Sequence, residues 1–152
     1  AKALGISGAN AFTYDGMVGL SSSTSFNFDP TNRAVSGQVD AIGVLEHEIT
    51  EVMGRTGSLN YASVGYTPLD LFRFSAAGVH DTAPAAGYFS IDGQTMLQQY
   101  NNPLNGGDVA DWVPSLKGDA FGSAYTGVTL ALSATDIREM DVLGWTRASL
   151  TS

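Results

Sequence analysis

The chain contains no cysteine and has few charged side chains. Among its 152 residues, 7 Lys and Arg stand against 15 Asp and Glu, so the formal net charge is −8. Without cysteine, disulfide bonds, thiolate zinc sites and cysteine nucleophiles are excluded. The shortage of basic side chains argues against binding to nucleic acid or anionic membranes, which both need clustered Lys and Arg. No apolar run approaches the roughly 18 residues that a transmembrane helix requires.

Glycine and neutral polar residues take the place of the missing charges. The chain has 18 Gly, and only 14% of its residues are charged, against an average of about 25%. This composition favours a loop-rich secreted protein, and we expect an extracellular location. The length fits one domain over residues 1–152, and we expect a monomer.

The hydrophobic pattern predicts two helices. An apolar repeat at three- and four-residue spacing predicts a helix over residues 36–53, with its first residue as N-cap and Gly54 just after its end. A second helix begins at a capping box of Ser133 and Asp136. We therefore predict an α+β fold with a small sheet, a central helix, a long irregular region and a C-terminal helix. Short strands are predicted within residues 11–29, 69–74 and 88–91, and residues 101–112 are predicted to be loop.

The central helix carries an unusual cluster of ionisable side chains. Three of the four glutamates, Glu46, Glu48 and Glu51, lie within six residues around His47. His47 and Glu51 are four residues apart on one helix face, where their side chains can share a cation at about 2.0–2.2 Å. Glu48 is rotated roughly a quarter turn and can flank the open side of that metal, as a general base must.

The alternative is a solvent-facing row of helix charges, which is an ordinary arrangement. Two features favour the metal site. The chain is poor in charge elsewhere, so the cluster stands out. The helix is also rich in apolar residues and is expected to be buried, where acidic side chains need partners.

Residues 46–55, EHEITEVMGR, resemble the active-site helix of the zincin metallopeptidases, whose motif is HExxH. Gly54 falls on the glycine of the longer metzincin motif, HExxHxxG. Six segments are similar, in order, to motifs of a family of secreted bacterial metalloproteases related to metzincins, and they cover most of residues 15–145. These segments are DGMVGLSS, HEITEVMGR, YTPLDLFRFS, YFSIDG, GDVADW and LSATDIREMDVLGW.

The resemblance implies a zinc-dependent endopeptidase that hydrolyses peptide bonds in extended peptide or protein substrates. It makes His47 and Glu51 metal ligands and Glu48 the general base. Two positions depart from the motif. Glu51 stands where the second histidine is expected, and Gly57 stands at the position of the third ligand. An anionic ligand set weakens the preference for zinc over harder ions.

Asp70 is the first choice for a third ligand, because it is an acid in an otherwise apolar stretch. An ion pair with an arginine or a turn cap would explain it equally well. His80, in a polar loop, and a phenol from Tyr61 or Tyr66 are the other choices.

Asp108 and Asp111 lie in a glycine-rich loop, where they can bind calcium together with loop carbonyls or stabilise the turn. The alternative function is a catalytically inactive metzincin-like binding or structural module, metal-free or calcium-bound. A metal hydrolase acting on other substrates is a third. Metzincins generally have a larger sheet and a helix before the active-site helix, so we expect the natural polypeptide to extend upstream of Ala1.

Overall fold

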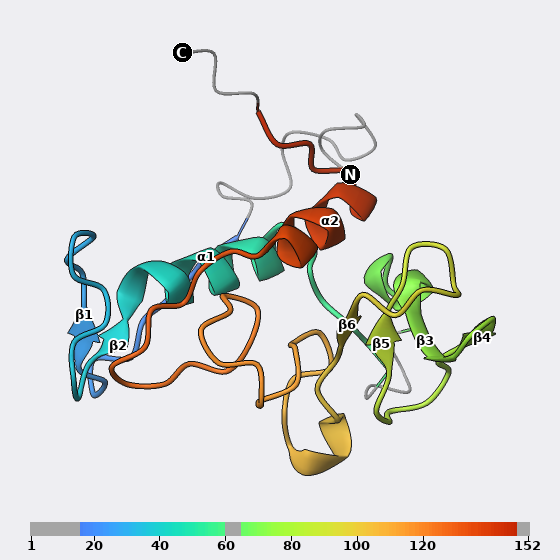
Figure 1. Cartoon of the computed structure of the whole chain (residues 1–152), viewed down its shortest axis with the longest axis horizontal. Helices are drawn as coiled ribbons and strands as arrows, with labels where there is room; N and C mark the ends of the chain where they lie inside the picture. The colour runs from blue at the N-terminus through green and yellow to red at the C-terminus, as the bar shows by residue number, and fades with distance from the viewer. Residues whose placement is uncertain (1–15, 60–64, 149–152) are drawn as a thin grey trace.

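The computed structural model describes residues 16–59 and 65–148 and has a mixed α+β fold (Figure 1). Its helices are α1 (Ala41–Val52) and α2 (Ala134–Val142), which lie side by side. β1 (Phe26–Asn27) and β2 (Val39–Asp40) form a parallel pair at the start of α1. The second sheet is antiparallel, with the order β4-β3-β5-β6. Its strands are β3 (Arg73–Ala76), β4 (Val79–His80), β5 (Tyr88–Phe89) and β6 (Gln98–Gln99).

The predicted start of the central helix is wrong, because its N-cap is Asp40 and not Ser36. The two residues of β2 pair with β1 instead of entering the helix. The Asp40 carboxylate is fully buried and accepts hydrogen bonds from the amides of Ile42 (3.2 Å) and Leu130 (2.9 Å). It therefore joins the start of α1 to the segment that leads into α2. The predicted end is confirmed, since Gly54 follows the helix with φ +111°.

The capping box of the second helix is confirmed. Ser133 accepts from the Asp136 amide at 3.2 Å, and the Asp136 carboxylate accepts from the Ser133 amide at 2.8 Å. The strand predicted over residues 69–74 is partly wrong, because Leu69–Phe72 forms a 3-10 turn after Pro68 and the strand begins at Arg73. Of residues 88–91, only the first two are strand. Residues 101–112 are irregular apart from a 3-10 turn at Pro103–Asn105, and residues 11–15 lie outside the described part.

Two carboxylates of α2 point into the core and hold aromatic side chains of the irregular region. Asp136 accepts a hydrogen bond from the Trp112 indole at 2.7 Å, and Glu139 accepts one from the Tyr100 hydroxyl at 2.6 Å. All four side chains are at most 1% exposed. α2 thereby fixes loops that have little regular structure of their own. The buried core cluster consists of Leu69, Phe89, Tyr100, Ala110, Trp112, Ala120, Phe121 and Met140.

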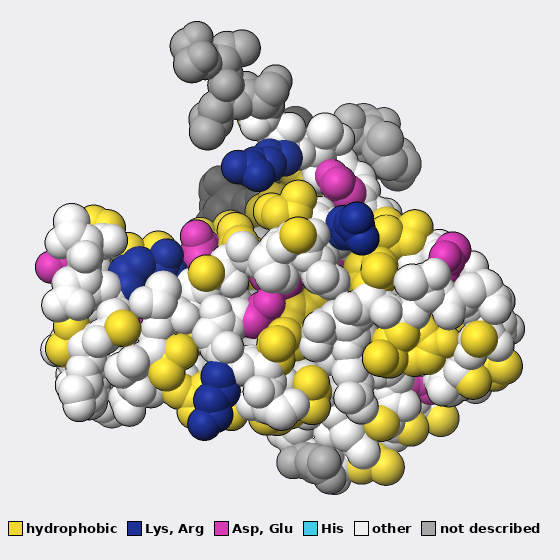
Figure 2. Space-filling view, viewed as in Figure 1, with side chains coloured by type: hydrophobic (Ala, Val, Ile, Leu, Met, Phe, Trp, Pro, Cys, Tyr) yellow, Lys and Arg dark blue, Asp and Glu magenta, His cyan; other side chains and the backbone are white. Residues whose placement is uncertain are grey.

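Neutral groups dominate the surface, as the composition requires. Figure 2 shows one face made mostly of white neutral polar and backbone atoms and yellow apolar side chains, with few charged ones. Among the described residues, neither helix is long and apolar enough to cross a membrane.

The buried Glu139 gives a pH-dependent stability prediction. Burial raises the pKa of Glu139 to about 8, although the charge of Arg55 and the hydrogen bond from Tyr100 partly lower it. Between its unfolded pKa of about 4.3 and pH 8, unfolding therefore releases a proton, and this group costs about 1.4 kcal/mol of stability per pH unit as pH rises. We expect Glu139→Gln to keep the Tyr100 hydrogen bond and to remove this slope. Denaturant unfolding from pH 5 to pH 8 measures it, and parallel profiles for wild type and variant would contradict the assignment.

Candidate metal centre

The orientation of His47 is fixed from its far side. Its Nδ1 lies 2.8 Å from the backbone carbonyl of Ala120, which comes from the irregular region. A carbonyl oxygen only accepts, so Nδ1 carries the proton and donates it. This bond sets the tautomer of the neutral imidazole and leaves Nε2 free on the other side, as in histidines that bind metals.

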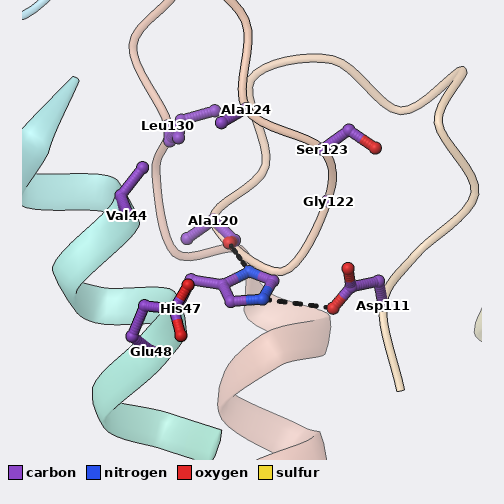
Figure 3. Close-up of a pocket in the computed structure, with 9 residues that line it drawn as sticks. All are labelled: Val44, His47, Glu48, Asp111, Ala120, Gly122, Ser123, Ala124 and Leu130. Atoms are coloured by element: carbon purple, nitrogen blue, oxygen red, sulfur yellow. Dashed lines mark hydrogen bonds and ion pairs between the residues drawn. The ribbon is translucent and has the colours of Figure 1, made fainter. Parts of the chain in front are cut away.

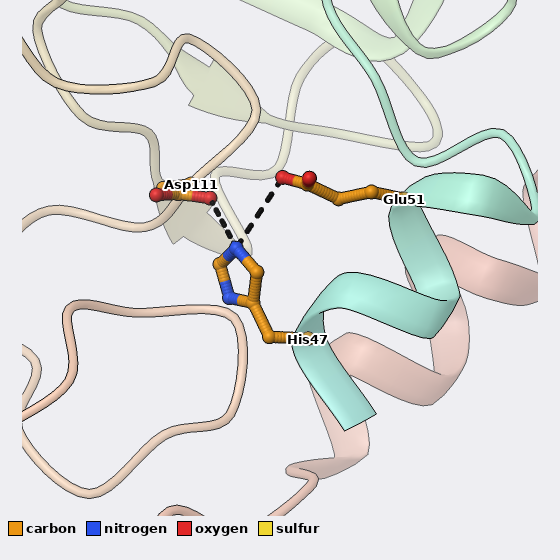
Figure 4. Close-up of side chains that lie close together, drawn as sticks. All are labelled: His47, Glu51 and Asp111. Carbon is orange, nitrogen blue, oxygen red and sulfur yellow. Dashed lines mark ion pairs between the residues drawn. The ribbon is translucent and has the colours of Figure 1, made fainter. Parts of the chain in front are cut away.

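Nε2 faces two carboxylates (Figure 4). It lies 3.3 Å from Oε1 of Glu51, one turn further along α1, and 3.2 Å from Oδ1 of Asp111, which comes from the loop before Trp112. One ligand atom from each side chain lies within 4.8 Å of the others. Two ligands of a tetrahedral ion with bonds of about 2.0–2.1 Å are about 3.3 Å apart. The three side chains can therefore hold one metal ion.

The electrostatics show how strongly this point attracts a positive charge. Burial lowers the pKa of His47, but the hydrogen bonds to Asp111 and Glu51 outweigh it and raise the pKa to about 10. Burial raises the pKa of Glu51, but His47 and the charge of Arg55 bring it below its usual value. Without a metal, an imidazolium proton occupies the point between the carboxylates. A metal ion bound there would replace that proton.

The loop that carries Asp111 is held on both sides of this residue. Before it, the Ala110 carbonyl accepts a 3.0 Å hydrogen bond from Arg55. After it, the Trp112 amide donates to the Phe121 carbonyl at 2.9 Å, and its indole is held by α2. The Asp111 carbonyl itself accepts from the Asn101 amide at 2.7 Å. The carboxylate is therefore positioned by the backbone around it.

Glu48 lies on the same side of α1 as His47 and lines a pocket beside the cluster (Figure 3). The pocket has a volume of about 180 Å³. Its polar end is formed by His47, Glu48 and Asp111, and the remaining wall is small and mostly apolar. That wall consists of Val44, Ala120, Gly122, Ser123, Ala124 and Leu130.

The structure brings His47 and Glu51 together and places Glu48 in the wall of the adjoining pocket. The third side chain of the cluster is Asp111, and not Asp70. The Asp70 carboxylate is buried and accepts from the amide and hydroxyl of both Ser58 and Thr67 at 2.7–3.2 Å. This is the turn-cap interpretation of Asp70. In the sequence, Asp111 stands out only as an acid of a glycine-rich loop that can bind calcium or stabilise the turn, and nothing local ties it to His47, 64 positions away in the chain.

The other ligand choices lie elsewhere. His80 is exposed on β4 and stacks on Phe74 with ring centroids 4.2 Å apart. Tyr66 is 63% exposed, and Tyr61 lies outside the described residues. The Asp108 carboxylate accepts a hydrogen bond from the Ala110 amide at 2.7 Å. Asp108 therefore stabilises the turn, which is one of its two predicted roles.

Comparisons of the chain with protein-family models, with curated proteins and with solved structures gave no match. The metzincin-like family therefore stays a prediction that depends on the sequence motifs.

Asparagine variants of Asp111 and Asp70 test which of the two residues is a metal ligand and which caps a turn. We expect Asp111→Asn to weaken zinc binding by more than about 100-fold, because losing even a supporting partner of a ligand costs about 10–100-fold. Asp70→Asn should keep zinc affinity and lower the free energy of unfolding by roughly 2 kcal/mol, since it weakens hydrogen bonds to a buried charge. Competition titration with a chromogenic chelator and denaturant unfolding measure the two effects. Loss of zinc in Asp70→Asn alone would reverse the assignment.

Proposed function

We propose that this chain is a metal-dependent endopeptidase that uses zinc held by His47, Glu51 and Asp111. The observation that supports it most is the convergence of these three ligand atoms on one point, where His47 and Asp111 also line an open pocket together with Glu48. Three protein ligands with a free fourth position are typical of catalytic zinc, whereas structural zinc sites have four. The resemblance of residues 46–55 to the zincin helix supports the same reaction class.

In this proposal, bound zinc supplies Lewis acidity toward a water molecule and toward the substrate carbonyl. Glu48 accepts a proton from the attacking water as the water oxygen bonds to the carbonyl carbon. Glu48 then passes that proton to the departing amine nitrogen as the carbon–nitrogen bond breaks, which leaves a free carboxyl and a free amine. His47 keeps its ring fixed throughout through the hydrogen bond to Ala120.

The pocket indicates which peptides fit. Its wall carries Val44, Leu130 and the methyl groups of two alanines, and its polar end carries two acids and a histidine. A cavity of about 150 Å³ lined by apolar side chains accommodates a benzene ring, so 180 Å³ is enough for an aliphatic or small aromatic side chain. Acidic side chains would be repelled by Glu48 and Asp111. We therefore propose substrates with an uncharged apolar residue next to the cleaved bond.

A second candidate function has its own support. The imidazolium form of His47, together with Arg55, balances the charges of Glu51 and Asp111 without any metal. The cluster then serves as a buried ion-pair network in an inactive binding or structural module. The two candidates differ in one simple measurement. An endopeptidase must bind zinc at this point, and zinc at 100 times its Kd would raise stability by about 2.7 kcal/mol.

Glutamine variants of two glutamates on α1 test the catalytic role. We expect Glu48→Gln to keep zinc and fold but to cut hydrolysis of a quenched fluorescent peptide by about 10²–10⁴-fold, the usual contribution of a positioned base. Glu46→Gln is the matched control, because Glu46 pairs with Arg33 at 3.6 Å and does not line the pocket. It should leave hydrolysis unchanged. Equal rates for wild type and Glu48→Gln would refute the role of Glu48.

A further inference from the structure

Arg55 is a fully buried charge that contacts both carboxylates of the metal centre. Its Nη2 lies 3.5 Å from Oε1 of Glu51, and its Nη1 lies 3.5 Å from Oδ1 of Asp111. These are the same two oxygens that face His47 Nε2. One guanidinium group therefore spans the two carboxylates that also face the histidine.

The guanidinium cannot move away from this position. Its Nε donates to the Thr50 hydroxyl at 3.1 Å, and Nη1 donates to the Ala110 carbonyl at 3.0 Å. Its carbon lies 4.2 Å from the centroid of the Phe121 ring, and the residue is 0% exposed. Arginine side chains are cationic in proteins, so this guanidinium places a positive charge beside the two carboxylates.

The positive charge of Arg55 changes the net charge of the metal centre. Glu48, Glu51 and Asp111 contribute three negative charges, and Arg55 leaves two when the imidazole is neutral. A divalent ion then makes the centre neutral. Without Arg55, the three carboxylates would give the centre a net charge of −3.

We propose that Arg55 is a countercharge that makes the metal centre select zinc over calcium. This inference rests on the proposed metal site. Hard cations such as Ca²⁺ are bound through charge, and their affinity follows the number of anionic ligands. Zinc also gains from its bond to the imidazole nitrogen, a ligand that suits it and not calcium. Removing one unit of negative charge therefore weakens calcium binding more than zinc binding.

The test is the ratio of the calcium Kd to the zinc Kd, measured by competition titration with the two ions alone. Arg55→Met should lower this ratio by about tenfold or more, within the range seen for partners of metal ligands. Arg55→Lys keeps the charge and should hold the ratio within about threefold of wild type, even if both affinities fall because Lys cannot span two carboxylates. A merely structural arginine would weaken both ions alike, so an unchanged ratio in folded Arg55→Met would overturn the proposal.

Arg55→Met removes the buried donor of the Ala110 carbonyl and of the Thr50 hydroxyl and can fail to fold, so Glu48→Gln provides a second test. It removes one negative charge without touching Arg55 or a ligand, and it should raise the ratio by about tenfold if the charge total governs selectivity. No rise would overturn the proposal. Failure of wild type to bind zinc would overturn the proposed function as well, whereas zinc binding with an insensitive ratio would overturn only the role of Arg55.

Discussion

The hydrogen bond between the Trp112 indole and Asp136 is the interaction on which the metal centre depends. Asp111 lies in a loop, and a loop places a ligand accurately only where its backbone is held. Trp112 is fully buried, 4.8 Å from the Tyr100 ring centroid, and its N–H has a charged acceptor on α2 at 2.7 Å. Such charge-assisted bonds are stronger than neutral ones. The C-terminal helix thus fixes the residue next to Asp111.

Two buried arginines extend this principle to the irregular region, where sheet hydrogen bonds are few. Arg73 donates to the carbonyls of Val109 and Ala85, both at 2.6 Å, and pairs with Asp81 at 2.8 Å. Arg55 does the same for Ala110. Buried backbone carbonyls need donors, and a guanidinium supplies up to five in fixed geometry. Long side chains here replace the strand partners that the loops lack, which explains how a chain with two- to four-residue strands forms a defined core.

The sequence predicts the parts of this design that are local. Helix periodicity, the Ser133 capping box and the glycine after α1 are encoded within a few residues, and so is the shared face of His47 and Glu51. The start of α1 is missed because Val39 and Asp40 pair with β1, a segment more than ten positions earlier in the chain, instead of entering the helix. The grouping of Asp111 with His47 is missed for the same reason. Asp70 is a different case, because a buried acid in an apolar stretch can be either a metal ligand or the cap of a turn. Only its hydrogen bonds with Ser58 and Thr67 distinguish the two roles.

The proton on His47 and a metal ion compete for one point, and this competition bears on what the metal is for. The hydrogen bonds to Asp111 and Glu51 raise the pKa of His47 to about 10, so the two carboxylates favour a positive charge between them even without a metal. A structural zinc site, by contrast, has no such substitute and unfolds without its ion. The fold around this centre is also held by bonds that involve no ligand, including those of Asp40, Asp136 and Glu139. A metal bound by His47, Glu51 and Asp111 would therefore be one of several connections between the helices and the irregular region, and the others need no ion.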